Sequence, residues 1–241
     1  MNVYFVTTGL AEEVQVLKKV RPPRLLCSYW YFKNRPLADF CRDLGYHPEI
    51  LLDSGAYSAF TKGKSISLMD YAGYIERNAQ ELSGYVSLDV IRDDFVTRSY
   101  YNILRGKGFA PIPVYHYGES TDTLRFYAEH GETTIALGNT VPIRDKARVA
   151  EWCQNLHDQF PSLRFHLLGS SSSRVLQCGA LESCDSSAWY MLAVNGKPKA
   201  IPGRNRDAKI ARAEANLRRI MEEFNEMPVL HSDSTHQPTD R

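Results

Sequence analysis

Short apolar runs alternate along the chain with longer stretches in which apolar residues recur every three or four positions. The short runs are typical of buried parallel strands, and the longer stretches are typical of amphipathic helices. Strands are predicted at 3–7, 24–32, 50–53, 85–91, 110–115, 133–137, 164–168 and 180–184. Helices are predicted at 10–20, 37–44, 68–82, 96–104, 121–130, 146–160, 174–178 and 205–224.

This alternation predicts an α/β fold, a single (β/α)8 barrel of the TIM type. The 241 residues are close to the ~250 that are usual for a barrel. A doubly wound sheet is the alternative, although no Gly-x-Gly-x-x-Gly segment follows any predicted strand. We expect the barrel to occupy residues 1–226 and the polar segment 227–241 to be a disordered, flexible C-terminal tail.

Three predicted strands run into an aspartate. Asp53 follows Ile-Leu-Leu and precedes Ser-Gly, Asp89 follows Ser-Leu, and Asp185 follows Ser-Cys. The carboxyl ends of barrel strands open on one mouth, so these side chains should converge. Two carboxylates across a substrate suit glycosidic chemistry, and a third can accept hydrogen bonds from N–H donors. For one Asp-Ser-Gly segment alone, a turn or a helix cap explains the residues equally well.

Residues at the ends of the neighbouring strands are candidates for the rest of this mouth. They are His116 and Tyr117 after the fifth predicted strand, and Gly138 and Asn139 after the sixth. Tyr57, four residues after the first aspartate, is placed to stack on a flat ring.

Composition and charge narrow the setting of this site. The formal net charge of +1 gives no global attraction for a polyanion. The five cysteines have no paired or zinc-type spacing, which favours a reduced, cytoplasmic protein without a metal. The N-terminus lacks a signal-peptide pattern, and no apolar run approaches the ~20 residues of a membrane helix. We therefore expect no membrane association.

The segment Asp-Ser-Gly-Ala-Tyr at 53–57 resembles the Asp-Ser-Gly-Gly-Phe/Tyr motif of tRNA-guanine transglycosylases. These barrel enzymes exchange guanine for a 7-deazaguanine, and the resemblance continues in order to the eighth predicted strand. It implies that Asp53 is the general acid/base, Asp185 the nucleophile that holds the sugar, and Asp89 the reader of the guanine edge. It also implies no cofactor.

The same resemblance implies further contacts with the base. Tyr57 would stack on the base, and the backbone at Gly138 and Asn139 would hydrogen-bond to it. Leu168 and Gly169 resemble the segment that closes over the other face of the base.

Several departures from the family pattern change the expected substrate. Ala56 replaces the second glycine, Tyr117 replaces a base-reading glutamine, and Pro-Thr-Arg does not follow Asp185. The C-terminal zinc site of the family is missing. A shortened, zinc-less relative is most similar to the DNA-guanine transglycosylases, including phage-encoded forms. The implied partners are a polynucleotide, a 7-deazaguanine base and a second copy of the chain in a homodimer. DNA is favoured over tRNA as the polynucleotide. The implied location is the cytoplasm, which is the cytoplasm of the host if the protein is phage-encoded.

A basic segment follows the eighth predicted strand. Lys197, Lys199, Arg204 and Arg206 are candidates for contacts with nucleic-acid phosphates. Acidic residues dilute this segment, so a solvated helix face is the alternative.

Three other functions remain open at this stage. They are a tRNA-guanine transglycosylase, a hydrolytic N-glycosidase or nucleosidase with water in place of the incoming base, and a non-catalytic barrel that binds nucleic acid.

Overall fold

The computed structural model describes residues 1–169, 175 and 179–225. Their strands form one parallel sheet in the order β4-β3-β2-β1-β8-β7-β6-β5. The strands are β1 (Asn2–Thr7), β2 (Arg24–Ser28), β3 (Glu49–Asp53), β4 (Gly84–Tyr85), β5 (Val114–His116), β6 (Thr134–Gly138), β7 (Arg164–Leu167) and β8 (Ser183–Ser186). The sheet curls until its two outer strands meet at a bridge between Val86 and Ile112. The predicted TIM-type α/β fold is therefore confirmed.

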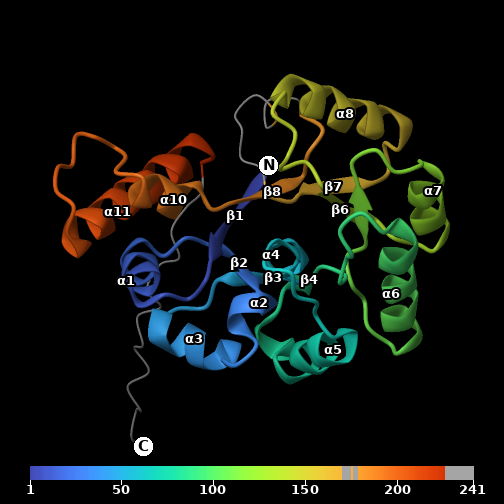
Figure 1. Ribbon diagram of the computed structural model, residues 1–241, viewed down its shortest axis with the longest axis horizontal. Coiled ribbons are helices and arrows are strands. Elements are labelled where there is room, and N and C mark those ends of the chain that lie inside the picture. The colour runs from blue at the N-terminus through green and yellow to red at the C-terminus, as the bar shows by residue number, and fades with distance from the viewer. Residues whose placement is uncertain (170–174, 176–178, 226–241) are drawn as a thin grey trace, which may run out of the picture.

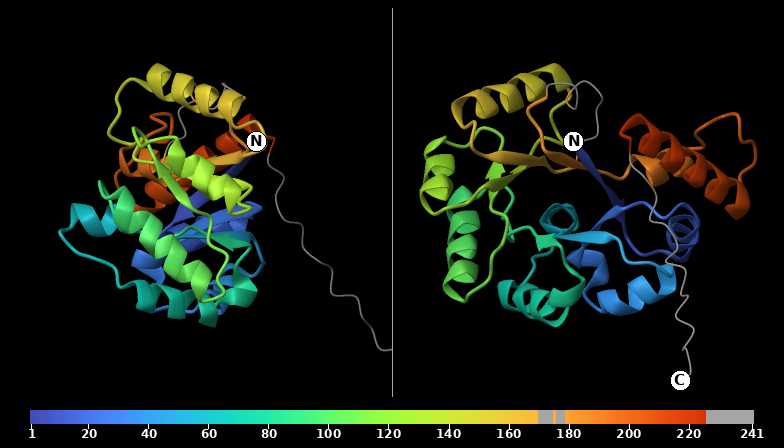
Figure 2. Two further views of the ribbon diagram at one scale, coloured as in Figure 1. Left: turned by 90° about the vertical axis from the view of Figure 1, so that its right-hand side faces the viewer. Right: turned by 180° about the vertical axis from the view of Figure 1, so that it is seen from behind.

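Helices surround the curled sheet in a ring, which Figure 1 shows from one end and Figure 2 from behind and from the side. The described helices are α1 (Ala11–Val20), α2 (Tyr29–Phe32), α3 (Leu37–Leu44), α4 (Ala56–Thr61), α5 (Leu68–Arg77), α6 (Asp94–Gly106), α7 (Asp122–Glu129), α8 (Lys146–Gln159), α10 (Ala188–Val194) and α11 (Arg206–Glu223), with a 3-10 turn at Ala79–Glu81. Among these helices, none combines the length and the apolar character that a membrane span requires.

Two layers of apolar side chains hold the barrel together. The larger cluster lies between the strands and the helices, and it includes Phe5, Leu25 and Trp189. The smaller cluster fills the inside of the barrel and consists of Leu26, Leu51, Val86, Val114 and Ala136. Strands such as β2 and β3 contribute to both layers because successive side chains of a strand point to opposite faces.

The structure corrects four predicted strands. The second strand ends at Ser28, and Tyr29–Phe32 turn into α2, whose first and last residues are buried. The fourth strand is only Gly84–Tyr85, so Asp89 lies in the segment after it. The fifth strand, predicted at 110–115, is Val114–His116. The eighth strand is Ser183–Ser186 and therefore contains Asp185.

Other differences concern helices. The pattern missed α4 and α10, which are short and begin directly after strand ends. The predicted helix at 174–178 lies, except for residue 175, outside the described residues, and so does the predicted tail at 227–241.

Candidate functional site

Strand alternation brings the candidate side chains to one end of the barrel. Residues two apart on a strand share a face, so Asp53 points to the same side as Leu51, which belongs to the interior cluster. By the same rule Ser28 shares a face with Leu26, and Gly138 with Ala136. The last inward position of several strands is thus small or polar, which opens the barrel interior at its carboxyl end.

A cavity of about 220 Å³ lies at this mouth. Eight predicted residues line it: Asp53, Tyr57, Asp89, Gly138, Asn139, Leu168, Gly169 and Asp185. The sequence analysis did not name the other lining residues as site residues; they are Val6, Leu26, Ser28, Tyr31, Gly55, Ser58, Ile91, Val141, Pro142 and Ser187. The period-two position of Ser28 after Leu26 is a signal that could have found it.

Asp53, the last residue of β3, is held by the turn that follows the strand. Its Oδ2 accepts a hydrogen bond from the Gly55 amide at 2.9 Å. Burial, followed by the negative charges of Asp89 and Asp185, raises the pKa of Asp53 from 3.8 to about 7. The nearby Ser28 hydroxyl acts in the opposite direction and favours the charged form of Asp53. Ser28 Oγ is buried and forms no hydrogen bond with the described residues. Near neutral pH, Asp53 can therefore both give and take a proton.

Asp185 is held by groups from the neighbouring strand β7 and the segment that follows it. It is 5% exposed, and its Oδ1 accepts a hydrogen bond from the Gly169 amide at 2.8 Å. His166 Nε2 lies 3.6 Å from the same oxygen, beyond hydrogen-bond distance, while His166 Nδ1 contacts Ser183 Oγ at 2.8 Å. Gly169 has a left-handed φ of +71°, and a Cβ there would meet Val141, so this position favours glycine.

Asp89 lies opposite, between a hydroxyl group and a histidine. Ser54 Oγ donates to Asp89 Oδ1 at 3.1 Å, and His116 Nε2 lies 3.3 Å from Asp89 Oδ2. The second ring nitrogen of His116, Nδ1, lies 3.1 Å from Asp94 Oδ1. Burial acts to lower the pKa of His116, but hydrogen bonds to Asp89 and Asp94 outweigh it, and the pKa lies above its usual value of 6.5.

Two predicted site residues lie outside the cavity wall. His116 is 3% exposed and packs behind Asp89. Its ring also lies close to Gly138, where an added Cβ would be only 3.0 Å from His116 Cδ2. Tyr117 packs edge-on against Trp152, with ring centroids 5.0 Å apart. Neither residue is among those that line the mouth.

Histidine, cysteine and acidic side chains lie close together at two places in the part of the chain that the structure describes, and nothing else there marks either place as a metal site. Cys41, His47 and Glu81 form one group, and Asp94, His116 and Glu119 form the other, each with ligand atoms within 4.8 Å. In the second group the histidine already lies between two carboxylates, so a cation there would compete with these contacts. The absence of a metal stays a prediction.

The basic segment is only partly available for phosphate contacts. Arg206 forms an ion pair with Glu12 at 3.3 Å, whereas Lys197, Lys199 and Arg204 are exposed and form no ion pair with the described residues. Polynucleotide binding by this segment stays a prediction.

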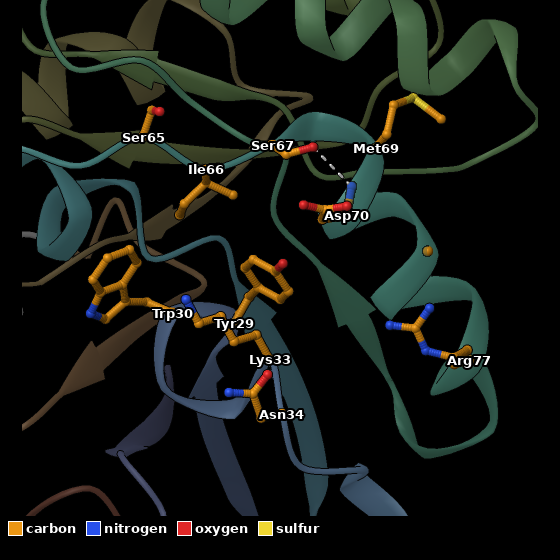
Figure 3. A pocket seen from close by; sticks show the side chains of 11 residues that line it. Tyr29, Trp30, Lys33, Asn34, Ser65, Ile66, Ser67, Met69, Asp70 and Arg77 are labelled. Atoms are coloured by element: carbon orange, nitrogen blue, oxygen red, sulfur yellow. Dashed lines mark hydrogen bonds between the residues drawn. The ribbon is translucent and has the colours of Figure 1, made fainter.

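A second, larger cavity of about 500 Å³ lies between α2 and α5, and Figure 3 shows it from close by. Lys33 lies on its α2 side, and Asp70 and Arg77 lie on its α5 side. All three are exposed and they differ in sign, so this groove does not select the charge of a ligand. The mouth of the barrel is the better candidate site, because its acids are of one sign and partly or fully buried.

Comparisons with known proteins inform the fold. A scan against protein-family models and a search of curated proteins find no match. One similar solved structure is a protein from Coccidioides immitis described as a fructose-1,6-biphosphate aldolase. It is 13% identical to this chain, with a TM-score of 0.56, and the alignment covers 93% of this chain and 91% of that protein. The YdjI aldolase from Escherichia coli K12 is 11% identical with a TM-score of 0.55, at 93% and 90% coverage. The carboxyl transferase domain of Rhizobium etli pyruvate carboxylase, solved with pyruvate, is 10% identical with a TM-score of 0.53, at 92% and 48% coverage.

These comparisons overturn the assignment to the tRNA-guanine transglycosylases. The reported neighbours are aldolases and a carboxyl transferase, and no family model supports the resemblance. The predicted glycosyltransferase, with its exchange of guanine for a 7-deazaguanine in DNA, is therefore wrong. The alternatives, a tRNA-guanine transglycosylase, an N-glycosidase or nucleosidase and a non-catalytic binder, gain no support either.

Local geometry explains why the motif misled us. Asp53 accepts from the Gly55 amide, and Ser54 Oγ accepts from the Ala56 amide at 3.2 Å. Gly55 has a φ of +79°, and a Cβ there would lie 2.5 Å from Trp30 Cβ. Asp-Ser-Gly is thus what a tight strand-to-helix turn needs, whatever chemistry follows.

Proposed function

We propose that this chain is an enzyme that moves a proton to or from its substrate at the barrel mouth, with Asp53 as the general acid and base. The observation that carries the proposal is the raised pKa of Asp53, to about 7, in a cavity that it shares with Asp89 and Asp185. A group with a pKa near the working pH is the most effective proton-transfer catalyst. Perturbed acids in a cleft also favour a functional site over a structural one.

The charge of the wall favours a class of substrate. Asp53, Asp89 and Asp185 line the mouth, and the described lining contains no lysine, arginine or histidine. Like charges at close range repel an anionic substrate and stabilise positive charge that develops during reaction. The preferred substrate is therefore small and either uncharged or cationic. Tyr57 and Tyr31, both about half exposed, supply flat apolar walls for it.

A second candidate function is an aldol-type lyase that uses a divalent cation. The observation that favours it is the surplus of carboxylates, since oxygen ligands suit Mg²⁺ and Mn²⁺. Such a cation would polarise a carbonyl group while Asp53 removes the proton from a hydroxyl group. A Schiff-base route has no support, because it needs a lysine and the described lining offers none. The likeness to two aldolases, at 13% and 11% identity, supports the barrel fold and not this reaction.

Ligand-induced stabilisation of the whole chain tests the proposal. The full-length protein and an Asp53→Asn variant are heated with panels of uncharged polyols and aldoses, cationic amines and sugar phosphates. A compound that binds the folded state raises the melting temperature with its concentration. We expect hits among uncharged or cationic compounds, and we expect conversion of a hit by the wild type but not by Asp53→Asn.

The outcomes separate the two candidates. Stabilisation only by sugar phosphates would overturn the proposed substrate class. Conversion that Asp53→Asn leaves unchanged would overturn the role of Asp53. Activity that disappears with a chelator and returns with Mg²⁺ or Mn²⁺ would favour the lyase.

A further inference from the structure

A line of three side chains connects the mouth to the surface. Asp89 lines the cavity, His116 is buried behind it, and the side chain of Asp94 at the start of α6 is 46% exposed. Both ring nitrogens of His116 face carboxylate oxygens, Nε2 facing Asp89 at 3.3 Å and Nδ1 facing Asp94 at 3.1 Å. The buried ring therefore spans the wall between the cavity and the solvent.

We propose that Asp89, His116 and Asp94 form a proton relay that exchanges protons between the mouth and solvent. The inference rests on the proposed function, because it supplies the protons that an acid–base site must gain or lose in each cycle. Asp53 has its own contacts, the Gly55 amide and the neighbouring charges, and has no exposed hydrogen-bond partner among the described residues. The relay provides a route for protons between the cavity and solvent through the wall, so that protons need not pass the bound substrate.

The transfer balances one proton at each step. In the outward direction, Asp89 gives a proton to Nε2 of a neutral ring that carries its proton at Nδ1, and the doubly protonated ring then gives the Nδ1 proton to Asp94, which passes it to water. In the inward direction each step is reversed: Asp94 takes a proton from water and gives it to Nδ1, and Nε2 gives its proton to Asp89. An outward transfer leaves the ring proton at Nε2, which is the form from which an inward transfer begins, so alternate transfers restore the ring. No bond other than O–H and N–H forms or breaks, and no oxidant or metal is needed.

The groups around His116 stabilise the doubly protonated ring through which the relay passes. Asp89, Asp94 and Glu119 are the charged groups that face it, and each favours its protonated form. Glu119 Oε2 accepts from the His116 backbone amide at 3.0 Å rather than from the ring. A backbone contact of this kind fixes the position of the ring and leaves both nitrogens to the two aspartates.

The histidine on the other side of the mouth serves as a matched control. His166 also has a ring nitrogen near a cavity aspartate, at 3.6 Å from Asp185. Its other nitrogen contacts Ser183, which is 8% exposed, so this path does not reach an exposed acid. Among the described residues, a path from the mouth through a histidine to an exposed acid is found on the Asp89 side and not through His166.

Nuclear magnetic resonance of the full chain with ¹⁵N-labelled histidine tests the relay without any substrate. The measured quantity is the rate at which the ring N–H protons of His116 and His166 exchange with water. An Asp94→Asn variant keeps a hydrogen-bond acceptor for Nδ1 but cannot take a proton. We expect it to slow exchange at His116 by about 10²-fold, the lower end of what a positioned acid–base group contributes. Exchange at His166 should not change, and added formate should restore the rate at His116.

Each other result would overturn the relay. Unchanged exchange in Asp94→Asn, or slowing that formate does not relieve, would mean that His116 only holds Asp89 in place. A His116 spectrum that shifts on addition of a chelator would mean that the cluster binds a metal ion. The proposed function is judged separately, from the ¹³C titration of the Asp53 carboxyl group, so the two can fail independently.

Discussion

Replacing Asp53 by asparagine should remove a large pH dependence of stability. The folded-state pKa of about 7 lies above the ordinary value of 3.8, so between these values the folded chain binds a proton that the unfolded chain has lost. The free energy of unfolding then falls as pH rises, by about 1.4 kcal/mol per pH unit. The full loss above pH ~7 is at most about 4 kcal/mol, because the side chain is partly open to the cavity. Wild type should therefore be less stable than Asp53→Asn at pH ~8, with the difference vanishing near pH ~4.

Urea denaturation of both proteins at several pH values measures this difference directly. Asparagine retains an oxygen that accepts from the Gly55 amide, so the turn is preserved. Asp89→Asn and Asp185→Asn each remove a neighbouring charge, and each should reduce the pH dependence that Asp53 causes. Asp70→Asn, on the exposed first turn of α5, is the control and should leave it unchanged. Parallel stability curves for wild type and Asp53→Asn would refute the reasoning.

Three further predictions concern the framework of the site, each measured as a free energy of unfolding. Gly63→Ala should cost ~1–2 kcal/mol, because its only penalty is a left-handed backbone. Gly55→Ala should cost clearly more, because a Cβ at Gly55 also meets other atoms and a Cβ at Gly63 does not. Equal costs would contradict this. Tyr71→Phe should cost ~1–3 kcal/mol, because it leaves the Val86 carbonyl, which accepts from Tyr71 Oη at 2.6 Å, without that buried donor. Arg212→Ala should cost ~2–3 kcal/mol, because the buried guanidinium donates hydrogen bonds to two carbonyl groups of the loop before α11. A cost below that of replacing an exposed arginine by alanine would contradict this.

The barrel could be predicted from sequence because its signal is repeated. Each buried strand of a parallel sheet is apolar on both faces, and this pattern recurs along the whole chain. The ends of elements were less predictable. The aromatic run at Tyr29–Phe32 has strand propensity, yet it forms α2, because Tyr29 and Phe32 are one helical turn apart and both pack into the core.

The cavity wall was predictable where an aspartate ends or follows an apolar run of the sequence, as at Asp53, Asp89 and Asp185, although Asp89 lies four residues after β4. Loop and helix residues of the wall were predictable where they closely follow a predicted strand, as Tyr57 and Asn139 do, and not elsewhere, because no periodicity places their side chains. Tyr31 belongs to α2, and Pro142 to the loop after β6, and both reach the wall through tertiary packing.

The role of Asp94 escaped the sequence analysis for a similar reason. It lies at the first position of α6, where an acidic residue is ordinarily a helix-dipole partner. Only the folded chain shows that His116, on β5, directs its Nδ1 toward this acid.

The arrangement of acids is hard to explain by stability alone. Asp53 shares its face of β3 with Leu51 and lies beside Ser28, and Asp185 lies near His166, which is behind the wall; no described basic residue lines the cavity itself. Repulsion and burial together raise the pKa of Asp53, which makes the charged form costly in the folded state. An apolar residue at Asp53 would avoid that cost and extend the interior cluster of Leu26 and Leu51 toward the mouth. The fold could avoid this cost, and the acids lie at the end of the barrel where substrates bind. We therefore infer that these acids are kept for chemistry and not for stability.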